Sequence, residues 1–431
     1  MNFVSNNVGP TRSLVLLGAS GSVGSSTLRY LKSLSNYNLN INHKQEQIEL
    51  NAVTVHSSVD RLIEILNDFP SVKFAGLTNE IVFQNEKHNL ANQFPHIKFF
   101  GGSTGVVNLV YESEADTVLT AIVGAAGIDA TVAAIRCGKK IALANKETLV
   151  TAGPAIQYEI EQLNQNQRSK QNANSNHDLL IGQKSTSIIP VDSEHNAAFQ
   201  LIEGILPARI RKLILTASGG PFRDISIEQI KQVTKKQVLN HPTWKMGPKI
   251  SVDSAGMINK GLELIEAHFL FQIGYDQLDA RIHRSSYVHA MVQTSDGSML
   301  LSSSPPDMVF PIAHSLHYPD AVPVRHKPDD DCANWPPLEF ESVDVQKYPG
   351  FQLAMDAGKQ GGTAPAILNA ANEVAVSLFL NGDIEFYRIP EIIDDSLQQI
   401  IVEKGTELSL FIEADRKTRH YLNNRFSKIR H

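Results

Sequence analysis

Two short polar segments of the chain carry side chains suited to binding a cation and an anion. Asp192 and Glu194 follow the apolar residues 188–189, so we expect them just beyond the end of a strand. Residues two positions apart on an extended segment project to the same side, so both carboxylates would point toward one place. Carboxylate oxygens are ligands that hard divalent cations prefer.

The second segment, residues 251–263, indicates a turn that leads into a helix. We expect Ser254 to cap this helix, because apolar residues at helical spacing follow it. Asn259 and Glu263 lie four residues apart, and Lys260 lies one position round the helix. Both segments together offer three oxygen ligands for a cation, plus several donors for an anion. Either segment alone is better explained as a solvated acidic turn, so the functional interpretation depends on the surrounding elements.

The length and composition predict a globular protein of two or three domains. The chain has 431 residues, of which 42% are hydrophobic and 19% charged. A formal net charge of −6 gives no electrostatic reason to expect nucleic acid or an anionic membrane as a partner. No apolar run approaches membrane-span length, and the first twelve residues lack the apolar core of a secretory signal. The two cysteines, Cys137 and Cys332, cannot form a disulfide framework. We expect an intracellular protein, cytoplasmic in a bacterium or plastid-type if a presequence has been removed.

A glycine-rich turn near the N-terminus predicts a nucleotide site. An apolar strand at residues 13–17 runs into Gly18-Ala19-Ser20-Gly21-Ser22-Val23-Gly24, and a helix is expected from residue 26 to 34. Strand, glycine turn and helix N-terminus in this order form a cradle for phosphate groups. The spacing alone is a weak signal, but a strand at 48–55 and a helix at 59–67 complete a βαβ unit.

A second polar cluster is expected at the same edge of that sheet. Residues 116–124 indicate a buried parallel strand, and the strand at 140–143 ends in Asn145, Lys146 and Glu147. Ligands of open α/β sheets bind at the carboxyl ends of the strands. The alternative is a polar turn, which we consider less favoured because the glycine turn points to the same edge.

The rest of the chain predicts a loop-rich middle and a helical end. A strand at 213–217 leads to Ser218 and a glycine turn, and residues 241–248 form a candidate lid around Trp244. Residues 164–178 are rich in Asn and Gln, which indicates a mobile surface insertion, and the sequence assigns no function to it. Residues 318–337 indicate a Pro-rich linker. Helical patterns then follow at residues 351–357, 364–380, 390–402 and 412–421.

These segments resemble the motifs of one family. They are GASGSVG at 18–24, LANKE at 143–147, VDSEHNA at 191–197, SGGPF at 218–222, HP at 241–242, KISVDSA at 249–255, MINKGLE at 257–263 and LNAANE at 368–373. In this order, from residue 14 to about residue 380, the chain closely resembles the 1-deoxy-D-xylulose 5-phosphate reductoisomerase family. The resemblance implies NADPH-dependent isomerisation and reduction of that sugar phosphate to 2-C-methyl-D-erythritol 4-phosphate, in non-mevalonate (MEP) isoprenoid synthesis.

The resemblance also implies roles for single residues. The cation, Mg²⁺, Mn²⁺ or Co²⁺, is expected on Asp192, Glu194 and Glu263, which with Lys146 form the catalytic set. NADPH contacts are expected at Ser20, Gly21, Ser22, Val23, Asn145, Glu147 and Gly247. Substrate contacts are expected at Lys146, Ser193, Glu194, Ser218, His241, Trp244, Met246, Ser254, Asn259, Lys260 and Glu263, with Trp244 and Met246 on a closing loop.

The implied architecture is an α/β protein in three parts. An N-terminal Rossmann-like NADPH domain is expected at residues 1–185 and a central α+β catalytic domain at 186–317, with a flexible loop at about 240–250. A linker at 318–345 and a C-terminal helical bundle domain at 346–431 complete the chain. The implied assembly is a homodimer, with dimerisation through the central domain and a sugar phosphate as the ligand.

Departures from the family pattern concern three regions. The insertion at 164–178 is longer than usual, and residues 283–289 and 306–311 keep only part of their motifs, which affects details of assembly. At the end of the second strand, His56, Ser57 and Ser58 replace a loop that commonly carries a lysine. NAD-specific sheets place an acid here, and this loop has none before Asp60. Neutral donors therefore predict NADPH with weakened discrimination, whereas the alternative is a plain turn with Ser58 as a helix cap.

Two other functional classes fit the sequence less well. Another NADP-dependent oxidoreductase, such as a semialdehyde dehydrogenase, needs a nucleophilic cysteine, and neither Cys137 nor Cys332 is suitably placed. A catalytically inactive dinucleotide-binding regulatory protein would be expected to lose the metal carboxylates or Lys146, and all are present.

Overall fold

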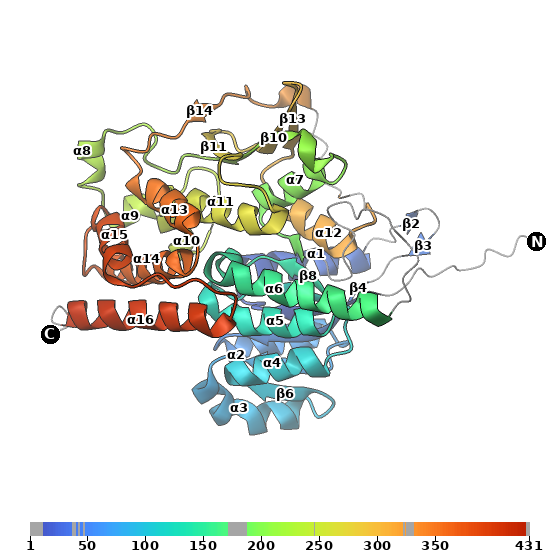
Figure 1. The fold of residues 1–431 in the computed structure, drawn as a ribbon. Coiled ribbons are helices and arrows are strands. Elements are labelled where there is room, and N and C mark those ends of the chain that lie inside the picture. Colours follow the sequence, from blue (N-terminus) through green and yellow to red (C-terminus); the bar gives the residue numbers. More distant parts are fainter. Residues whose placement is uncertain are drawn as a thin grey trace, which may run out of the picture.

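The protein folds into a parallel α/β sheet, a mixed sheet and a layer of C-terminal helices (Figure 1). The structure, a computed structural model, describes residues 12–36, 40–41, 44–45, 48–170, 188–244, 246–321, 324 and 332–427. No helix in these ranges is long and apolar enough to cross a membrane. The α/β fold class expected from the sequence is confirmed.

Within the described residues, seven parallel strands form the first sheet. In spatial order they are β6 (Lys98–Gly101), β5 (Phe74–Leu77), β4 (Ile48–Val55), β1 (Arg12–Leu17), β7 (Thr117–Thr120), β8 (Lys140–Leu143) and β9 (Ile188–Pro190). Strands β4, β5 and β6 lie on one side of β1 in the sheet, and strands β7, β8 and β9 lie on its other side. Such a reversal of strand order is where ligands bind at the carboxyl edge of an open sheet.

Helices cover both faces of this sheet because each connection between parallel strands must cross over. They are α1 (Ser22–Asn36), α2 (Val59–Asp68), α3 (Glu80–Gln93), α4 (Gly102–Glu112), α5 (Ile128–Arg136) and α6 (Lys146–Lys170). Two glycines allow the turn between β1 and α1. Gly18 has φ +84°, and a Cβ there would lie 2.5 Å from the carbonyl oxygen of Ala121. A Cβ on Gly24 would lie 2.4 Å from the oxygen of Gly18, so the helix can approach the strand only with glycine.

The first sheet extends beyond residue 185, where the end of the first domain was expected. Strand β9 pairs with β8 in parallel register, so the first sheet continues to Pro190. Helix α12 (Val309–His317), which belongs to the expected central domain by sequence, packs its Ile312 and Leu316 into the same core as Leu14 and Leu16. Both β9 and α12 therefore belong to the first sheet's layer in the folded protein, because they bury apolar side chains against this sheet.

The mixed sheet lies at the top of Figure 1. Its spatial order is β13 (Met299–Ser303), β12 (Val288–Thr294), β10 (Ile210–Ala217), β11 (Leu278–Ile282) and β14 (Glu341–Ser342). Helices α7 (Ser193–Ile202) and α11 (Ile258–Phe271) pack on it through a shared core that contains Ala198, Leu213 and Leu264. These two helices carry the residues expected to bind the metal, so the sheet holds both in place.

Two expected irregular segments are more ordered than predicted. The expected linker at 318–345 contributes β14, which pairs antiparallel with β11. Residues 164–170 of the expected insertion continue α6, because Asn and Gln do not prevent a helix that is already started. The remaining residues of that insertion, 171–178, lie outside the described residues, as does part of the linker.

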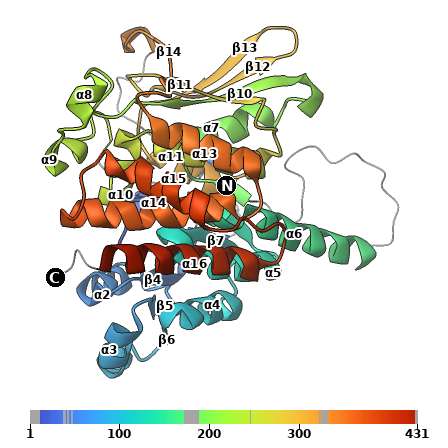
Figure 2. The same cartoon turned by 60° about the vertical axis from the view of Figure 1, so that its left-hand side comes forward.

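The C-terminal helices lie beside both sheets, as Figure 2 shows. They are α13 (Pro349–Gln360), α14 (Ala364–Asn381), α15 (Arg388–Gln399) and α16 (Leu408–Phe426). Helix α16 packs between α14 and α6, and α13 packs on α11. Between β10 and α11 lie the short helices α8 (Ile227–Ile230), α9 (Lys235–Val238) and α10 (Pro248–Ala255). The C-terminal helices therefore support both the nucleotide-type sheet and the helix that carries Glu263.

Candidate functional site

Asp192 and Glu194 lie at the N-terminus of α7 and not on an extended segment. Asp192 is the N-cap, and its Oδ1 accepts hydrogen bonds from the backbone N–H groups of Glu194 at 3.2 Å and His195 at 3.4 Å. Aspartate favours this position because it satisfies amide groups that have no partner within the helix. The position just beyond a strand is confirmed, because β9 ends at Pro190. The expected extended geometry is wrong, yet the first helical turn also directs both carboxylates to one place.

Asn259, Lys260 and Glu263 project from the first turns of α11, as their spacing predicts. The expected cap at Ser254 is wrong, because Ser254 lies inside α10. Helix α10 ends at its C-cap, Gly256. Met257 then adopts a left-handed conformation with φ 58° before α11 begins. The backbone oxygen of Met257 then accepts from the N–H groups of Lys260 and Gly261.

Three carboxylates and two lysines form one cluster. One oxygen atom from each of Asp192, Glu194 and Glu263 lies within 4.8 Å of the others. The ammonium of Lys146, the first residue of α6, donates to Asp192 Oδ2 at 2.9 Å and Glu263 Oε1 at 2.7 Å. The ammonium of Lys260 lies 3.1 Å from Glu194 Oε1 and also donates to Glu263 Oε2.

The cluster contains three carboxylates but only two lysines, and this difference in charge determines its electrostatics. Burial alone would lower the pKa of Lys146, but Asp192 and Glu263 raise it well above its usual value. Burial, with Glu263 and Asp192 nearby, raises the pKa of Glu194 despite the attraction of Lys260. Two ammonium groups therefore leave the three carboxylates with one uncompensated negative charge.

Glu266 and His195 lie behind the cluster and were missed as site residues. His195 is fully buried, with its Nε2 2.8 Å from the backbone oxygen of Glu263 and its Nδ1 3.3 Å from Asp192 and 3.2 Å from Glu266. Burial raises the pKa of Glu266 to about 7, and the two carboxylates raise that of His195 to about 9 against the effect of burial. The i,i+3 spacing of Glu263 and Glu266 on one helix was the available signal.

The cluster opens into a cavity of about 190 Å³. Every residue expected to bind the metal or the substrate lines it: Lys146, Asp192, Ser193, Glu194, Ser218, His241, Trp244, Met246, Ser254, Asn259, Lys260 and Glu263. Ser22 and Val23 of the glycine turn line it as well. So do Ile250 and Met308, which lie in the motif segments 249–255 and 306–311 but were not expected as site residues. Residues from both sheets thus meet around one space.

Ser218 and His241 form a hydrogen-bonded pair on one wall of the cavity. His241 Nδ1 accepts from the backbone N–H groups of Thr243 at 3.2 Å and Trp244 at 2.9 Å, so the proton of the neutral ring is on Nε2. That Nε2 lies 2.9 Å from Ser218 Oγ, which also accepts from Gly220 N. The Ser218 hydroxyl hydrogen is therefore left to point to another acceptor.

The expected cofactor residues divide into exposed and buried groups. Ser20, Gly21 and Ser22 are exposed at the start of α1, and residues 56–58 are exposed at the end of β4. The two places are adjacent, because Gly18 N and Ala19 N both donate to the backbone oxygen of Thr54, which immediately precedes the end of β4. This arrangement presents backbone N–H groups and hydroxyls to a nucleotide phosphate.

Asn145, Glu147 and Gly247 do not line the cavity described above. Asn145 is buried and donates to the backbone oxygens of Ile122 and Gly124, which holds the loop after β7. Glu147 accepts from the Lys249 ammonium at 2.5 Å, and Gly247 is the N-cap of α10. In this structure these residues position the edge of the sheet and the start of α10.

The three carboxylates fit a hard divalent cation. Their oxygens converge, they come from two rigidly packed helices, and they carry more negative charge than the lysines neutralise. Oxygen ligands of this type suit Mg²⁺ and Mn²⁺ and leave coordination positions for water or a ligand.

Comparison with known families covers most of the chain. Residues 14–153 match the family model described as "1-deoxy-D-xylulose 5-phosphate reductoisomerase". Residues 188–271 and 303–421 match models for two C-terminal domains of the same enzyme.

Individual proteins with this description align over nearly the full length. The protein from Leptospira interrogans is 45% identical over 416 residues, which cover 96% of this chain and 97% of that protein. The protein from Listeria welshimeri is 37% identical over 411 residues, covering 95% and 99%.

Solved structures show the same fold. A Zymomonas mobilis reductoisomerase in complex with NADPH superimposes with a TM-score of 0.80 at 34% identity, covering 95% of this chain and 98% of that one. A DOX-P reductoisomerase in complex with NADPH, fosmidomycin and magnesium gives 0.84 at 34% identity, covering 97% and 98%.

Proposed function

The chain belongs to the 1-deoxy-D-xylulose 5-phosphate reductoisomerase family, and on this premise we propose that its cavity converts that sugar phosphate into 2-C-methyl-D-erythritol 4-phosphate. The reaction is an isomerisation followed by reduction with NADPH, and it is a step of the non-mevalonate (MEP) isoprenoid pathway. The observation that carries the proposal is the convergence of three carboxylates and two lysines beside the carboxyl edge of a nucleotide-type sheet.

Asp192, Glu194 and Glu263 hold the divalent cation in this proposal. When bound there, the cation would polarise the ketone and an adjacent hydroxyl of the substrate. The raised pKa of Lys146 keeps it protonated at neutral pH, so it stabilises negative charge that develops on substrate oxygens and does not act as a base. The Asn259 Oδ1, 3.0 Å from the Lys146 ammonium, helps to orient that charge.

The phosphate end of the substrate is assigned to Ser218, Ser254, Asn259 and Lys260. Because Ser218 Oγ already accepts from His241 and Gly220, its own hydrogen is available for a phosphate oxygen. The Lys260 ammonium faces Glu194 and Glu263 in this structure, and a phosphate would compete with these carboxylates for it. Trp244 and Met246, on the loop between α9 and α10, would cover the substrate and exclude water.

NADPH supplies the hydride and is assigned to the glycine turn at residues 18–24 and to the loop at 56–58. Proteins of similar fold bind this cofactor, as the NADPH complexes named above show. The first N–H groups of α1 have no partner within the helix, and Ser22 and Val23 line the wall of the catalytic cavity. The nicotinamide would therefore reach the substrate next to the cation.

The structure argues against an acyl-transfer dehydrogenase. Such an enzyme needs a cysteine at the reacting carbon. Cys137 and Cys332 are exposed, and neither lines the cavity. An inactive binding protein is disfavoured because the complete set of carboxylates and lysines is present and assembled.

We also infer that the protein forms a homodimer and acts in the bacterial cytoplasm. The edge strand β13 exposes Met299, Leu300 and Leu301 by 46%, 42% and 43%, which makes it an apolar edge suited to another copy of the chain. The cytoplasmic location rests on the bacterial origin of the similar proteins.

The deciding experiment is an assay of NADPH oxidation with 1-deoxy-D-xylulose 5-phosphate and Mg²⁺ or Mn²⁺. We expect turnover by the wild type, loss of turnover with a chelator, and recovery when metal is restored. The Glu263→Gln variant should lose at least two orders of magnitude, because a neutral amide weakens the hold on the cation. Glu413→Gln, the same change at a half-buried position of α16 that does not line the cavity, should remain fully active. A metal-restored Glu263→Gln enzyme with near wild-type activity would refute the proposal.

A further inference from the structure

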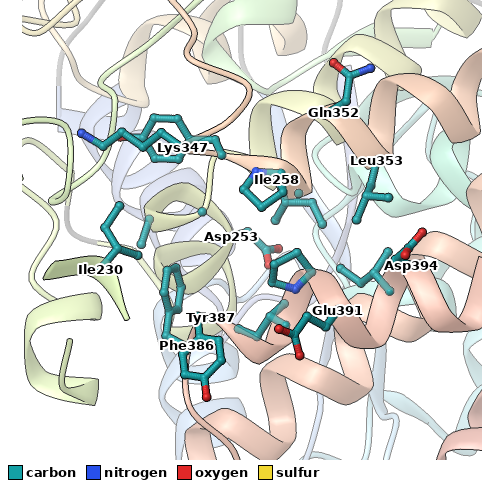
Figure 3. Close-up of a pocket in the computed structure, with 18 of the residues that line it drawn as sticks. Ile230, Asp253, Ile258, Lys347, Gln352, Leu353, Phe386, Tyr387, Glu391 and Asp394 are labelled. Carbon is teal, nitrogen blue, oxygen red and sulfur yellow. The ribbon is translucent and has the colours of Figure 1, made fainter. Parts of the chain in front are cut away.

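A second cavity, larger than the catalytic one, lies between α10, α13 and α15. Its volume is about 520 Å³, within the usual range of small-molecule sites. Aliphatic and aromatic side chains make up most of its wall, among them Ile230, Ile258, Leu353, Phe386 and Ile393 (Figure 3). None of the residues assigned above to metal, substrate or cofactor lines it.

The charged side chains that line this cavity are Lys231, Asp253, Lys347, Glu391 and Asp394. Figure 3 shows Glu391 and Asp394 together on one side and Lys347 on the other. Lys347 already donates to the backbone oxygen of Arg223 at 2.8 Å. Glu391 pairs with Arg388 through Oε2, and Asp394 accepts from Gln398 through Oδ2, so each carboxylate has one oxygen that these contacts do not use. The acidic side is therefore complementary to a cation.

The wall of the cavity also contains a hydrogen-bond acceptor without a partner. Asn372 of α14 is fully buried, and its Nδ2 donates to Asp253 Oδ1 at 2.9 Å. This contact sets the orientation of the amide, because the reverse orientation would place its oxygen against a carboxylate. Among the described residues, Asn372 Oδ1 then has no hydrogen-bond donor. Buried polar atoms are rarely left in this state, so a donor that reached this oxygen would stabilise it.

We propose that this cavity binds a small molecule with an apolar body and a primary ammonium group, and that its occupancy is transmitted to the active site through α10. The body would fill the aliphatic and aromatic part of the cavity. The ammonium would face Glu391 and Asp394 and supply N–H donors that a quaternary ammonium or a carboxylate lacks.

Helix α10 forms a common wall between the two cavities. Its Val252, Asp253 and Ala255 line the second cavity, whereas Ile250 and Ser254 line the catalytic one. Positions 250 and 254 are one turn apart, so the two faces of a single helix serve the two spaces. A ligand that shifts α10 would therefore move Ser254 and the preceding loop that carries Trp244.

Asp253 provides a polar connection in addition to the packing. Its Oδ2 lies 3.0 Å from the Lys249 ammonium, which also donates to Glu147, the residue next to Lys146. Asn372 holds the other oxygen of Asp253. A donor that engages Asn372 thus acts on a network that ends beside the catalytic lysine.

The binding test uses 4-phenylbutylamine as the probe, titrated calorimetrically into the full chain in the presence of Mg²⁺. Its N,N,N-trimethyl derivative has the same charge without donors, and 4-phenylbutanoate has the opposite charge. We expect the amine to bind at least tenfold more tightly than the carboxylate and several-fold more tightly than the trimethyl compound. Equal affinity for all three, or no binding of the amine, would overturn the proposal.

Amino-acid substitutions in the cavity wall test whether the probe binds in this cavity. Leu353→Trp fills the space from its half-buried rim and should abolish binding, and Glu391→Gln combined with Asp394→Asn should weaken the amine at least fivefold without affecting the carboxylate. Glu413→Gln should leave binding unchanged. If Leu353→Trp, folded by circular dichroism, still binds the amine normally, the probe is bound elsewhere and the assignment is wrong.

The transmission to the active site is tested separately. In a Trp335→Phe background, Trp244 is the remaining tryptophan, so its fluorescence reports on the catalytic loop. Saturating amine should shift this emission and change KM for the sugar phosphate at least twofold, and both effects should need at least fivefold more amine in the Glu391→Gln and Asp394→Asn double variant, which adds no tryptophan. The KM measurement rests on the proposed function, whereas calorimetry and fluorescence do not, so failure of one can be told from failure of the other. Binding without any change in Trp244 emission would refute the coupling.

Discussion

Replacing Lys260 with methionine should change metal and phosphate affinity in opposite directions. The Lys260 ammonium lies 3.1 Å from Glu194 Oε1 and contacts Glu263, two of the carboxylates assigned to the cation. A divalent ion bound to these oxygens at roughly 2.1–2.5 Å would lie about 5 Å from the ammonium. The lysine therefore repels the very ion that its carboxylate neighbours attract.

The magnitude follows from Coulomb's law. Charges of +1 and +2 separated by about 5 Å repel by about 1.7 kcal/mol at the dielectric constant of water, and by about 6.6 kcal/mol at an effective value of 20. Even the smaller figure corresponds to about a 15-fold change in dissociation constant. Methionine keeps the length and apolar character of the lysine stem, so the packing of α11 should be preserved.

The assay measures Mn²⁺ binding to metal-free protein by electron paramagnetic resonance, without substrate or cofactor. We expect Lys260→Met to bind Mn²⁺ at least tenfold more tightly than the wild type and to bind inorganic phosphate at least tenfold more weakly. Lys146→Met should also tighten Mn²⁺, because Lys146 contacts Asp192 and Glu263, but it should leave phosphate binding near the wild-type value. Lys417→Met controls for net charge at an exposed site. Unchanged or weakened Mn²⁺ affinity in a folded Lys260→Met protein would refute this reasoning.

Three further predictions concern pH, cofactor choice and assembly. Burial and Arg223 lower the pKa of His241 from 6.5 to about 4, so its contribution to stability should be complete above pH 6.5 and lost as pH falls to about 4; an imidazole titration by NMR with a midpoint near 6.5 would contradict this. Because residues 56–58 offer neutral donors, kcat/KM should favour NADPH over NADH by a modest factor, and equal values would show that this loop is misassigned. Leu301→Lys on β13 should halve the mass measured by light scattering, whereas Ile401→Lys, at an exposed position outside this strand, should not; a monomeric wild type would exclude the dimer.

The elements that position the site were largely predictable because their signals are local. The strands at 48–55 and 140–143 and the start of α14 at residue 364 coincide with the structure. The sequence signals for these elements are apolar periodicity and glycine or proline near an end. Both signals depend only on residues close together in the sequence. The same holds for the turn at residues 18–24, where steric contact requires glycine.

The first residue of a helix was less predictable where more than one nearby residue could act as the N-cap. Ser254 and Asp192 both have side chains that can cap a helix, but only Asp192 does so. In the first case the cap is Gly247, and proline at the next position starts the helix earlier. The preference of a single residue is small, so the surrounding packing decides between such alternatives.

The sequence by itself determined which residues carry the chemistry and which local elements present them, because residue type and spacing are written directly in it. Tertiary structure alone decided which of these residues meet. Lys146 and Glu263 are separated by 117 positions, and only the packing of α6 against α11 brings them into contact. Contact between α7 and α11 buries His195 and Glu266 behind the carboxylates and so shifts their pKa values. Burial and distance are properties of the folded chain, because desolvation and Coulomb interactions depend on what surrounds a charge and not on its neighbours in sequence.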